Sequence, residues 1–377
     1  MRVVVVGAGA WGLPAGAELA RRGHEVTVVD RFGVGNPWSS SSGATRLWRL
    51  AHTDPADVRL ALASVRAWRD LERRTSRTLL LTRGLLWRGA DVARVAAALA
   101  AEGVDHSCVD ATDVGRFFPG LRPNGLDAVW QPAAGPILAA EALDAQAAVL
   151  RAAGGRLVTA TVTAIDVGTD TARVTLDRRS AGRPSDDLAS EAGADLLADV
   201  VVVAAGPWAP VLLTGLGVAV PLVPGLGQVT HLTGRDGWAD LPCLIDGQQG
   251  DVGGSYALPT PGVGYKIGFR HAVRAFDPAD LDRTPDPAEQ VRLVARAADL
   301  GFDHPVVGPG QLCSWTDSDD GEFVLDRVHG GRVVVATGDT GHGFKFSAVL
   351  GRWLADLVEG RDLGPDVARF GIARLGV

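Results

Sequence analysis

The sequence predicts a mixed α/β fold, with a Rossmann-type domain assembled from separate segments and a mixed β-sheet inserted between them. Val3–Val6, Val200–Ala204 and Val333–Ala336 are short, continuous apolar runs, which are typical of parallel strands buried on both faces. A glycine-rich turn and a helical pattern follow the first run, as in a βαβ unit. Because the three runs are far apart in the chain, the predicted parallel sheet is built from non-contiguous pieces.

The first part of the chain alternates between strand and helix patterns. Pro14–Arg22 predicts a helix and Glu25–Asp30 a second strand, which completes one βαβ unit. Asp57–Thr75 predicts a helix because its apolar residues fall on one helical face. The segments expected next are an extended Leu79–Trp87, a helix Asp91–Glu102, a strand Asp127–Trp130 and a helix Ala139–Ala153.

The second part begins with Arg156–Val167 and Arg173–Asp177, which alternate in polarity like two paired strands. The polar stretch Arg178–Asp195 reads as a long, mobile hairpin connection. Val200–Leu232 has no Lys, Arg, Asp or Glu, but its prolines predict strand, short helix and strand rather than a membrane span. The remaining elements are predicted as strands Gln228–Leu232, Tyr256–Pro259, Tyr265–Phe269 and Val333–Ala336, and helices Ala288–Ala298 and Ala348–Val358.

Composition narrows the class of function. The net charge of −7 and the lack of a basic run argue against a nucleic-acid partner. The three cysteines, Cys108, Cys243 and Cys313, are too few and too scattered for a disulfide framework or a metal site, so we expect no metal and a reducing, cytoplasmic location. Of the 37 residues that are Lys or Arg, only Lys266 and Lys345 are lysines, which makes both of them candidate functional residues.

The motif Gly7-Ala8-Gly9-Ala10-Trp11-Gly12 has the context of a dinucleotide-binding fingerprint, between a strand and a helix. Gly7 makes the tight turn, Gly9 lets a pyrophosphate approach the backbone, and Gly12 lets helix and strand pack closely. Asp30 ends the next strand and can accept both ribose hydroxyls. NAD and FAD share this fingerprint, and Arg31 could also indicate a 2′-phosphate, so the motif alone does not choose the cofactor.

A second glycine-rich turn, Gly338–Ser347, follows the last apolar run and opens a helix. Gly341-His342-Gly343-Phe344-Lys345-Phe346-Ser347 resembles the signature of the monomeric sarcosine oxidase and N-methyltryptophan oxidase family, which are FAD-dependent oxidoreductases of the D-amino-acid oxidase type. The resemblance extends over nearly the whole chain. Its other carriers are Thr45-Arg46-Leu47-Trp48-Arg49, Gly264–Gly268, Pro221–Pro224 with Gln228-Val229, Val202–Trp208, and Cys313-Ser314-Trp315-Thr316 with Glu322–Asp326.

The resemblance implies FAD as the cofactor, with residues 1–85, 142–220 and 310–377 forming the FAD-binding domain. Residues 86–141 and 221–309 would then form the substrate domain. It also implies a thioether between Cys313 and the flavin, for which the alternative is an ordinary buried cysteine. The residues expected to bind the cofactor are Gly7, Gly9, Ala10, Trp11, Gly12, Asp30, Arg31, Ser42, Thr45, Arg46, Val162, Gly206, Trp208, Cys313, Gly341, Gly343, Phe344 and Lys345.

The same resemblance assigns catalytic roles. Arg49 and Lys345 hold the substrate carboxylate, Lys266 lies at the flavin and promotes reduction of O2, and His342 lies near the flavin or the substrate. The alternatives are a surface salt bridge for Arg49, an exposed strand lysine for Lys266 and a capping or core histidine for His342. Tyr256 is expected near the substrate.

The sequence departs from the family pattern in three places. Arg270, before His271, stands where the family has histidine, Trp315 replaces a tyrosine, and Ala44 replaces an acidic residue. Arg270 and Trp315 are expected in the substrate pocket, together with His271. The added cation and the larger aromatic ring indicate a substrate other than sarcosine, one that is bulkier or that carries a second anionic or aromatic group.

These observations predict an FAD-dependent oxidase of an amino acid with a secondary amine, N-methyl or cyclic, which forms an imine and reduces O2 to H2O2. The partners expected are a small amino acid and O2, without nucleic acid or membrane, and the protein is expected to be a monomer or weak homodimer. The alternatives are an imine-forming oxidase or dehydrogenase of natural-product biosynthesis, an NAD(P)-dependent dehydrogenase, and a flavin- or nucleotide-binding protein without catalysis.

Overall fold

The computed structural model describes residues 1–89, 91–177, 195–234, 237–247 and 254–376. The apolar runs form the centre of a six-stranded sheet, in which β1 pairs in parallel with β2 on one side and with β12 on the other. All strand pairs in this sheet are parallel except β20 with β21. In spatial order the strands are β20 (Val324–Val328), β21 (Val333–Thr337), β12 (Val200–Val203), β1 (Arg2–Val6), β2 (Glu25–Asp30) and β8 (Arg156–Thr159).

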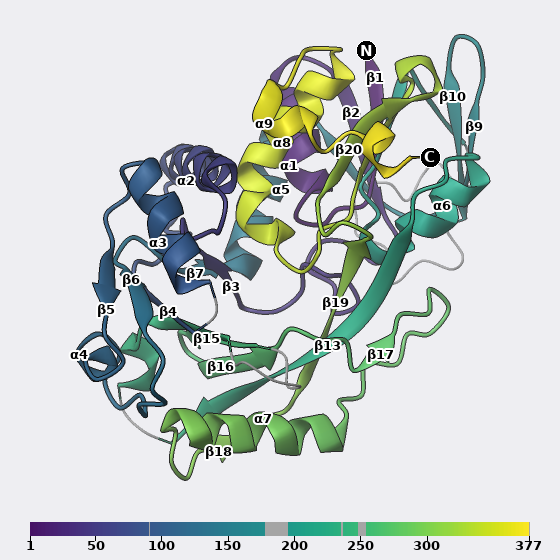
Figure 1. The fold of residues 1–377 in the computed structure, drawn as a ribbon. Coiled ribbons are helices and arrows are strands. Elements are labelled where there is room, and N and C mark those ends of the chain that lie inside the picture. Colours follow the sequence, from purple (N-terminus) through teal and green to yellow (C-terminus); the bar gives the residue numbers. More distant parts are fainter. Residues whose placement is uncertain (90, 178–194, 235–236, 248–253, 377) are drawn as a thin grey trace.

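Both faces of this sheet are covered, which explains why its strands are apolar on both sides. Val3 and Val5 of β1 pack in one apolar cluster with helices α1, α5 and α8, whereas Val4 and Val6 pack in another with α6 and a three-stranded sheet. Figure 1 shows the three helices stacked on one side of the sheet. The three-stranded sheet consists of β9 (Thr161–Val167), β10 (Ala172–Asp177) and β11 (Leu196–Ala198).

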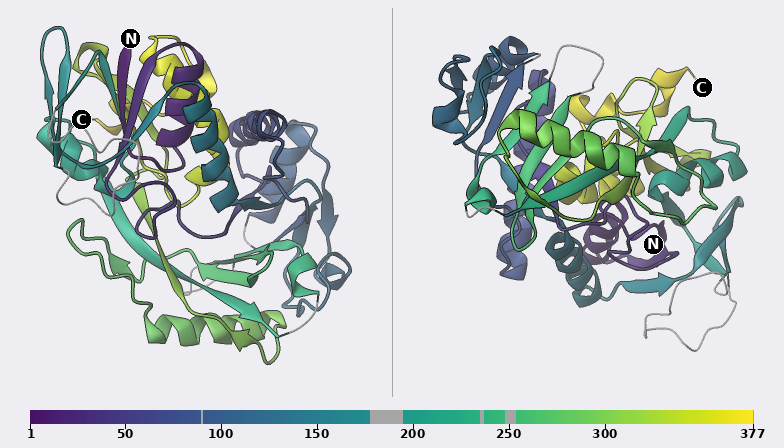
Figure 2. Two further views of the ribbon diagram at one scale, coloured as in Figure 1. Left: turned by 180° about the vertical axis from the view of Figure 1, so that it is seen from behind. Right: turned by 90° about the horizontal axis from the view of Figure 1, so that it is seen from below.

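A larger mixed sheet of ten strands forms the other half of the molecule, with the long strand β13 reaching from one half to the other (Figures 1 and 2). Helix α7 covers one of its faces through Leu293, Ala297 and Leu300. Its strands are β4 (Leu85–Gly89), β5 (Ser107–Val109), β6 (Ala128–Gln131), β13 (Leu222–Thr233), β14 (Cys243–Gly247), β15 (Ser255–Thr260), β16 (Gly264–Phe269), β17 (Arg274–Ala275), β18 (Val306–Val307) and β19 (Gln311–Ser318). A separate pair of strands consists of β3 (Thr45–Trp48) and β7 (Gly135–Leu138).

The helices of the described chain fall between these strands. The α-helices are α1 (Gly12–Arg21), α2 (Pro55–Thr75), α3 (Val92–Ala101), α4 (Val114–Phe117), α5 (Ala139–Ala152), α6 (Ala209–Gly215), α7 (Pro287–Leu300), α8 (Ser347–Val358) and α9 (Pro365–Ala368). The short 3-10 helices are η2 (Gly206–Trp208), η3 (Trp238–Asp240), η4 (His329–Gly331), η5 (Gly343–Phe346) and η6 (Ile372–Leu375). No helix in these described ranges is both long enough and apolar enough to span a bilayer.

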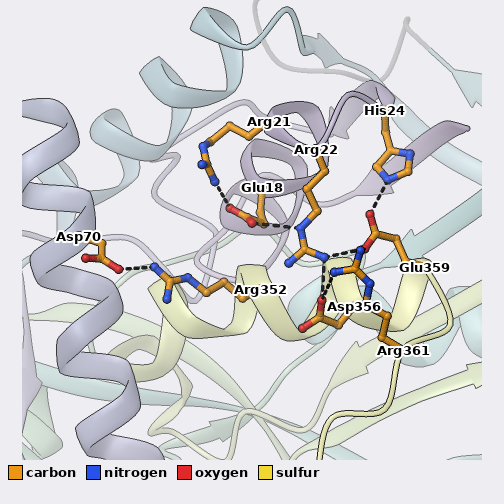
Figure 3. Close-up of polar contacts among 9 residues, drawn as sticks. All are labelled: Glu18, Arg21, Arg22, His24, Asp70, Arg352, Asp356, Glu359 and Arg361. Carbon is orange, nitrogen blue, oxygen red and sulfur yellow. Dashed lines mark hydrogen bonds and ion pairs between the residues drawn. The ribbon is translucent and has the colours of Figure 1, made fainter.

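Ion pairs join helix α1 to helix α8, which are far apart in the sequence (Figure 3). Arg22 Nη1 lies 2.7 Å from both Asp356 and Glu359, and His24 Nε2 lies 3.0 Å from Glu359. Helix α2 joins α8 through Asp70 and Arg352. Arg22 and Glu359 are largely shielded from solvent, and their pairs join the carboxyl ends of α1 and α8, at the ends of the helices away from the two glycine-rich turns.

The predicted βαβ unit and the predicted strand, helix and strand in Val200–Leu232 are confirmed, but the prediction of two paired strands after α5 is partly wrong. The predicted strand Arg156–Val167 is interrupted at Ala160, whose N–H donates to the Asp30 carbonyl oxygen. Its first part, β8, therefore pairs with β2, and only its second part, β9, pairs with β10. Leu79–Trp87 is a strand only from Leu85. The expected connection Arg178–Asp195 lies outside the described residues, apart from Asp195. The strands that the sequence did not predict are β3, β5, β7, β11, β14, β17, β18, β19 and β20.

Candidate active site

A cavity of about 480 Å³ lies at the carboxyl ends of β1, β2, β12 and β21. This is where a parallel α/β sheet binds ligands, because its loops and helix N-termini gather there. The cavity continues from the β1–α1 turn to Ser39–Ser41, to Gly206 and Trp208 after β12, and to Thr316 in β19.

The β1–α1 turn has the packing that its glycines require. Gly7 has φ +106°, and a Cβ there would lie 2.3 Å from the Ala204 carbonyl oxygen. A Cβ on Gly12 would lie 1.8 Å from the Gly7 oxygen, so only glycine permits this approach of helix to strand. Helix α1 begins without a side-chain cap, but the Leu13 N–H donates to the Gly9 carbonyl oxygen and Pro14 has no N–H, so it is chiefly the positive end of the helix dipole that favours an anion here.

Asp30 holds the turn in place from the end of β2. Its carboxylate accepts hydrogen bonds from the backbone N–H groups of Ala8, Phe32 and Gly33 at 2.8–2.9 Å. Burial nevertheless raises the pKa of Asp30. Asp30 therefore has a structural function in the turn in addition to facing the cavity.

Three buried polar atoms on the cavity wall have no hydrogen-bond partner within the protein. They are Arg31 Nε, Thr316 Oγ1 and Thr337 Oγ1, and all three residues line the cavity. Buried polar groups are costly when unpaired, so a ligand with hydroxyl, ring nitrogen or phosphate groups suits this wall. The unpaired atoms, the glycine turn and the apolar Val162, Ala204 and Trp208 together fit a dinucleotide such as FAD.

A second cavity of about 280 Å³ adjoins the first, and Ser40, Asp339 and Phe344 line both. It lies between the six-stranded sheet and the large mixed sheet. Five cationic residues line it, whereas its carboxylates are Asp317 and Asp339. The cations are Arg46, Arg49, Lys266, Arg270 and Lys345.

Lys266 is buried on β16, with 5% of its surface exposed. Its Nζ donates to the Thr45 carbonyl oxygen at 2.5 Å. Burial lowers the pKa of Lys266 to about 7, and the charge of Arg46 adds to the effect. The lysine is thus near the point of losing its charge at neutral pH.

Arg49 and Lys345 come together from β3's end and η5. Lys345 Nζ donates to the His342 carbonyl oxygen at 2.8 Å, and the Arg49 guanidinium lies 5.0 Å from the ring centroid of Trp87. Burial lowers the pKa of Arg49 to about 9 and that of Lys345 well below its ordinary value; the charge of Arg270 adds to both effects, and that of Arg49 adds to the effect on Lys345. Helix α2 fixes Lys345, because Ser64 and Trp68 both donate to its carbonyl oxygen.

Arg46 and Cys313 lie together at the cavity wall. Arg46 Nη2 donates to the carbonyl oxygens of Ser40 and Ser42 at 2.8 and 2.6 Å and lies 3.3 Å from Cys313 Sγ. Cys313 is partly exposed and faces the cavity, whereas Cys243 is buried and Cys108 lies on the distant strand β5. Arg46 is also 5.5 Å from the ring centroid of Phe344.

Comparison with known proteins identifies the class. The profile of FAD-dependent oxidoreductases of the DAO type matches residues 2–357. The chain belongs to this family. It is 26% identical to monomeric sarcosine oxidase of Bacillus sp. (strain B-0618) over 99% of this chain and 95% of that protein, and 24% identical to N-methyl-L-tryptophan oxidase of Citrobacter koseri over 99% and 98%.

Among solved structures, NikD, an unusual amino acid oxidase essential for nikkomycin biosynthesis, has a TM-score of 0.84 with 28% identity over 98% of this chain and 96% of that one. These comparisons confirm the predicted family, the fold and the class of enzyme, an FAD-dependent oxidase that acts on CH–NH donors. They do not bear on the roles of single residues.

In this FAD-dependent oxidoreductase the predicted cofactor residues divide between the two cavities. Gly7, Gly9, Ala10, Trp11, Asp30, Arg31, Val162, Gly206 and Trp208 line the first. Ser42, Arg46, Cys313, Gly341, Gly343, Phe344 and Lys345 line the second, Phe344 being common to both. Gly12 and Thr45 lie behind the walls, where Gly12 packs on Gly7 and the Thr45 carbonyl accepts from Lys266 and Arg46.

The predicted pocket residues are not all at the pocket. Tyr256, Arg270, Trp315 and His342 line the second cavity of the oxidoreductase. His271 instead has its Nε2 3.0 Å from the buried Glu289 on α7, and it is not among the described lining residues. Because β16 ends at Phe269, the side chain after Arg270 turns to the helix rather than to the cavity.

Asp339, which lines both cavities, is a site residue that the sequence analysis did not predict. Burial raises the pKa of Asp339 to about 6, and its Oδ1 accepts from the N–H of Gly341 at 2.9 Å. Ser41, Thr316 and Thr337 were also missed; Ser41 Oγ accepts from Ala10 N at 2.8 Å. The position of Asp339 inside the second glycine-rich turn was the one signal that could have found it. No group of metal-ligating side chains occurs among the described residues.

Proposed function

We propose that the enzyme oxidises the C–N bond of an α-amino acid whose nitrogen is a secondary amine, N-methyl or cyclic. The substrate loses two electrons and two protons, one from carbon and one from nitrogen, and becomes an imine. O2 accepts both pairs and becomes H2O2. The observation that carries this proposal is the meeting of Arg49 and Lys345 in a cavity that adjoins the dinucleotide cavity.

A carboxylate between Arg49 and Lys345 would remove an unfavourable interaction. After burial, the charge of Arg49 lowers the pKa of Lys345 and the charge of Arg270 lowers the pKa of both, and the carboxylate that opposes this, Asp57, already pairs with Arg369. An anion bound by the planar fork of Arg49 and the ammonium of Lys345 is fixed in orientation as well as position. Binding the carboxylate thereby orients the carbon next to the amine toward the cofactor cavity.

The histidines of the site act as neutral groups. Burial holds the pKa of His342 well below its ordinary value, and the charges of Lys345 and Arg49 lower it further. His52 behaves likewise for the same reasons. Among the described residues, Asp57 is the carboxylate whose charge acts on both Arg49 and Lys345, and it is paired with Arg369, so the substrate amine enters as the free base without a protein general base beside the two cations.

The chemistry that bound FAD supplies is two-electron transfer from the substrate carbon and onward to O2. Lys266 contributes a fixed ammonium in the cavity wall, where it stabilises the negative charge that O2 acquires on reduction. Arg46 donates to the same Thr45 carbonyl oxygen as Lys266 and to those of Ser40 and Ser42, which keeps the Ser40–Ser42 loop in place.

Cys313 is the proposed attachment point of the cofactor. Its thiol is in the cavity beside Arg46, in the strand whose Thr316 lines the dinucleotide cavity. Forming the thioether removes two electrons and two protons from the thiol and a flavin methyl group, and O2 is the oxidant. Acid precipitation of the yellow holoprotein tests this: we expect the colour to remain with the chain, and colour released by acid contradicts the thioether.

The function itself is tested by peroxide release. A panel of N-methyl and cyclic amino acids, with the corresponding primary amino acids as controls, should give H2O2 mainly with the secondary amines. Protein that is colourless and does not take up FAD, or that releases peroxide only with primary amines, contradicts the proposal.

A second candidate is an imine-forming oxidase of a natural-product pathway that acts on a cyclic amino acid, which the likeness to NikD favours.

We further propose that the enzyme works in the cytoplasm, as a monomer or weak homodimer, on small molecules alone. In the proposed division, residues 1–85, 142–220 and 310–377 bind FAD and 86–141 with 221–309 bind substrate; β19 crosses it by pairing with β13.

A further inference from the structure

Arg270 gives the substrate cavity a further cation, beyond Arg49 and Lys345, with no obvious use in binding a simple amino acid. It directly follows β16 and lines the cavity. Side chains alternate along a strand, so Lys266 and Gly268 face the same side of the sheet, while Tyr265 and Ile267 pack into the apolar core on the other. The strand therefore places Lys266 in the wall, and Arg270 lines the same cavity from the bend in which the strand ends.

The charge of Arg270 reaches the carboxylate site. It lowers the pKa of Arg49, Lys345 and His342, which means that the three side chains share one electrostatic environment. Asp317 accepts from Trp315 Nε1 at 2.8 Å, and Asp339 accepts from Gly341, so the two carboxylates of the wall have other partners.

One substrate carboxylate does not neutralise the positive charge of Arg49, Lys345 and Arg270 together. Arg49 and Lys345 suffice to bind it, and a third cation beside them adds repulsion unless a second negative charge is bound. Arg270 is also exposed at the end of its strand, where it can contact the far end of a bound molecule.

Resting on the proposed function, we propose that Arg270 forms a subsite for a second carboxylate, so that the preferred substrate is a dicarboxylic amino acid with a secondary amine. The α-carboxylate binds Arg49 and Lys345, and the side-chain carboxylate binds the Arg270 guanidinium. This subsite sets the specificity and takes no part in the transfer of electrons.

Binding of simple acids to the holoenzyme tests the subsite without turnover. Succinate, glutarate and adipate are compared by calorimetry with butyrate, valerate and hexanoate, which have the same carbon numbers. At least one dicarboxylate should bind roughly 10- to 100-fold more tightly than its partner, as expected for a hydrogen-bonded charge pair. Arg270→Gln should remove this preference, because it weakens binding of the dicarboxylate far more than binding of its monocarboxylate partner, and Arg270→Lys should keep part of the preference.

The matched control is Arg116→Gln, which removes an exposed arginine on α4 that pairs only with Asp113. It should leave every dissociation constant unchanged. Absence of a dicarboxylate preference in the wild type, or equal weakening of both kinds of acid in Arg270→Gln, overturns the subsite.

Turnover separates this proposal from the proposed function. N-methyl-L-glutamate should give a higher kcat/KM than N-methyl-L-norvaline, mainly through KM, and Arg270→Gln should make the two similar. A dicarboxylate preference in binding without peroxide from either compound leaves the subsite standing and overturns the proposed oxidase activity. If both compounds give peroxide with equal KM, the proposed oxidase activity stands and the Arg270 subsite is overturned.

Discussion

At the scale of the residue, the substrate cavity contains ionisable groups whose pKa values are shifted by burial so that the neutral form is favoured. Lys266 has a pKa near 7, and Asp339 on the facing turn has a pKa near 6. Burial is the first cause of both shifts; the charge of Arg46 adds to the shift of Lys266, whereas backbone hydrogen bonds oppose the shift of Asp339. Small changes in this environment therefore change which groups are charged at physiological pH.

Lys266 predicts a pH dependence with a definite sign. Because its pKa is lowered to about 7, the ammonium is present below that pH and lost above it. If the ammonium promotes O2 reduction, the rate constant for reoxidation should fall about tenfold from pH 6 to pH 8. Stopped-flow mixing of the reduced enzyme with O2 measures this rate.

Two variants complete this test. Lys266→Met should reoxidise slowly at every pH while flavin reduction by substrate changes little. Lys266→Arg stays charged, so its reoxidation should exceed that of the methionine variant and be flat with pH. A methionine variant that retains the wild-type pH profile would show that another group is responsible.

At the scale of the element, β19 separates the two cavities. Cys313, Trp315 and Asp317 line the substrate cavity, and Thr316 on the other face lines the dinucleotide cavity. The neighbouring strand β13 makes room for this arrangement, since Gly227 pairs with Cys313 and lies under the Trp315 ring. The position of Trp315 thus depends on a glycine in another strand.

Gly227→Ala should disturb the substrate cavity. A Cβ at Gly227 would lie 2.4 Å from Trp315 Cζ3, so the indole must shift. We expect KM to rise by about tenfold with the fold intact, as for a displacement of about 1 Å near a site. Steady-state kinetics with circular dichroism measure both effects.

Gly215→Ala is the control, because a Cβ there has nothing within 4 Å. The double variant Gly227→Ala/Trp315→Phe should recover much of the KM, since the smaller ring removes the clash. A double variant no better than Gly227→Ala alone would mean that the strand, not the indole, is disturbed.

At the scale of the whole molecule, a buried ionic cluster joins the strands of the large sheet to its covering helix. Asp246 on β14 contacts Arg88 on β4 at 2.7 Å and Arg296 on α7 at 2.5 Å. Asp246 and Arg88 are almost fully buried. Two arginines share one carboxylate, so the cluster depends on Asp246.

Asp246→Ala should strongly destabilise the protein, by about 3–5 kcal/mol, because it leaves two buried guanidinium groups without a counter-ion. Denaturant unfolding measures the change in the free energy of unfolding. Asp303→Ala, which removes an exposed pair with Arg122, should cost about 1 kcal/mol or less. Equal effects of the two substitutions would contradict a dominant role for the buried cluster.

The sequence predicted those parts of the fold that follow from local pattern. The βαβ unit, α7, α8 and the apolar strands have clear periodicity, and their elements were found within a few residues. Strand β19 was missed because its buried side chains include Ser314, Thr316 and Ser318, so burial alternates but hydrophobicity does not. Its polar inner face follows from the cavities it separates, which no local pattern reveals.

The site divides in the same way. The glycine turns and the two lysines were located by motif, and both lysines line one cavity. His271 was misplaced because its partner, Glu289, is on a helix whose packing the sequence does not show. Asp339 was missed because its significance comes from burial between two cavities, a property of the assembled molecule.

The strand order also constrains how the protein is made. β1 comes well before Val200–Val203, the strand that pairs with one of its edges, and the second glycine turn follows later still. Until Val200–Val203 has been synthesised, β1 is an apolar strand with an open edge, the kind of edge that invites aggregation. A cofactor held by both glycine turns can therefore be bound only after the second turn has been synthesised.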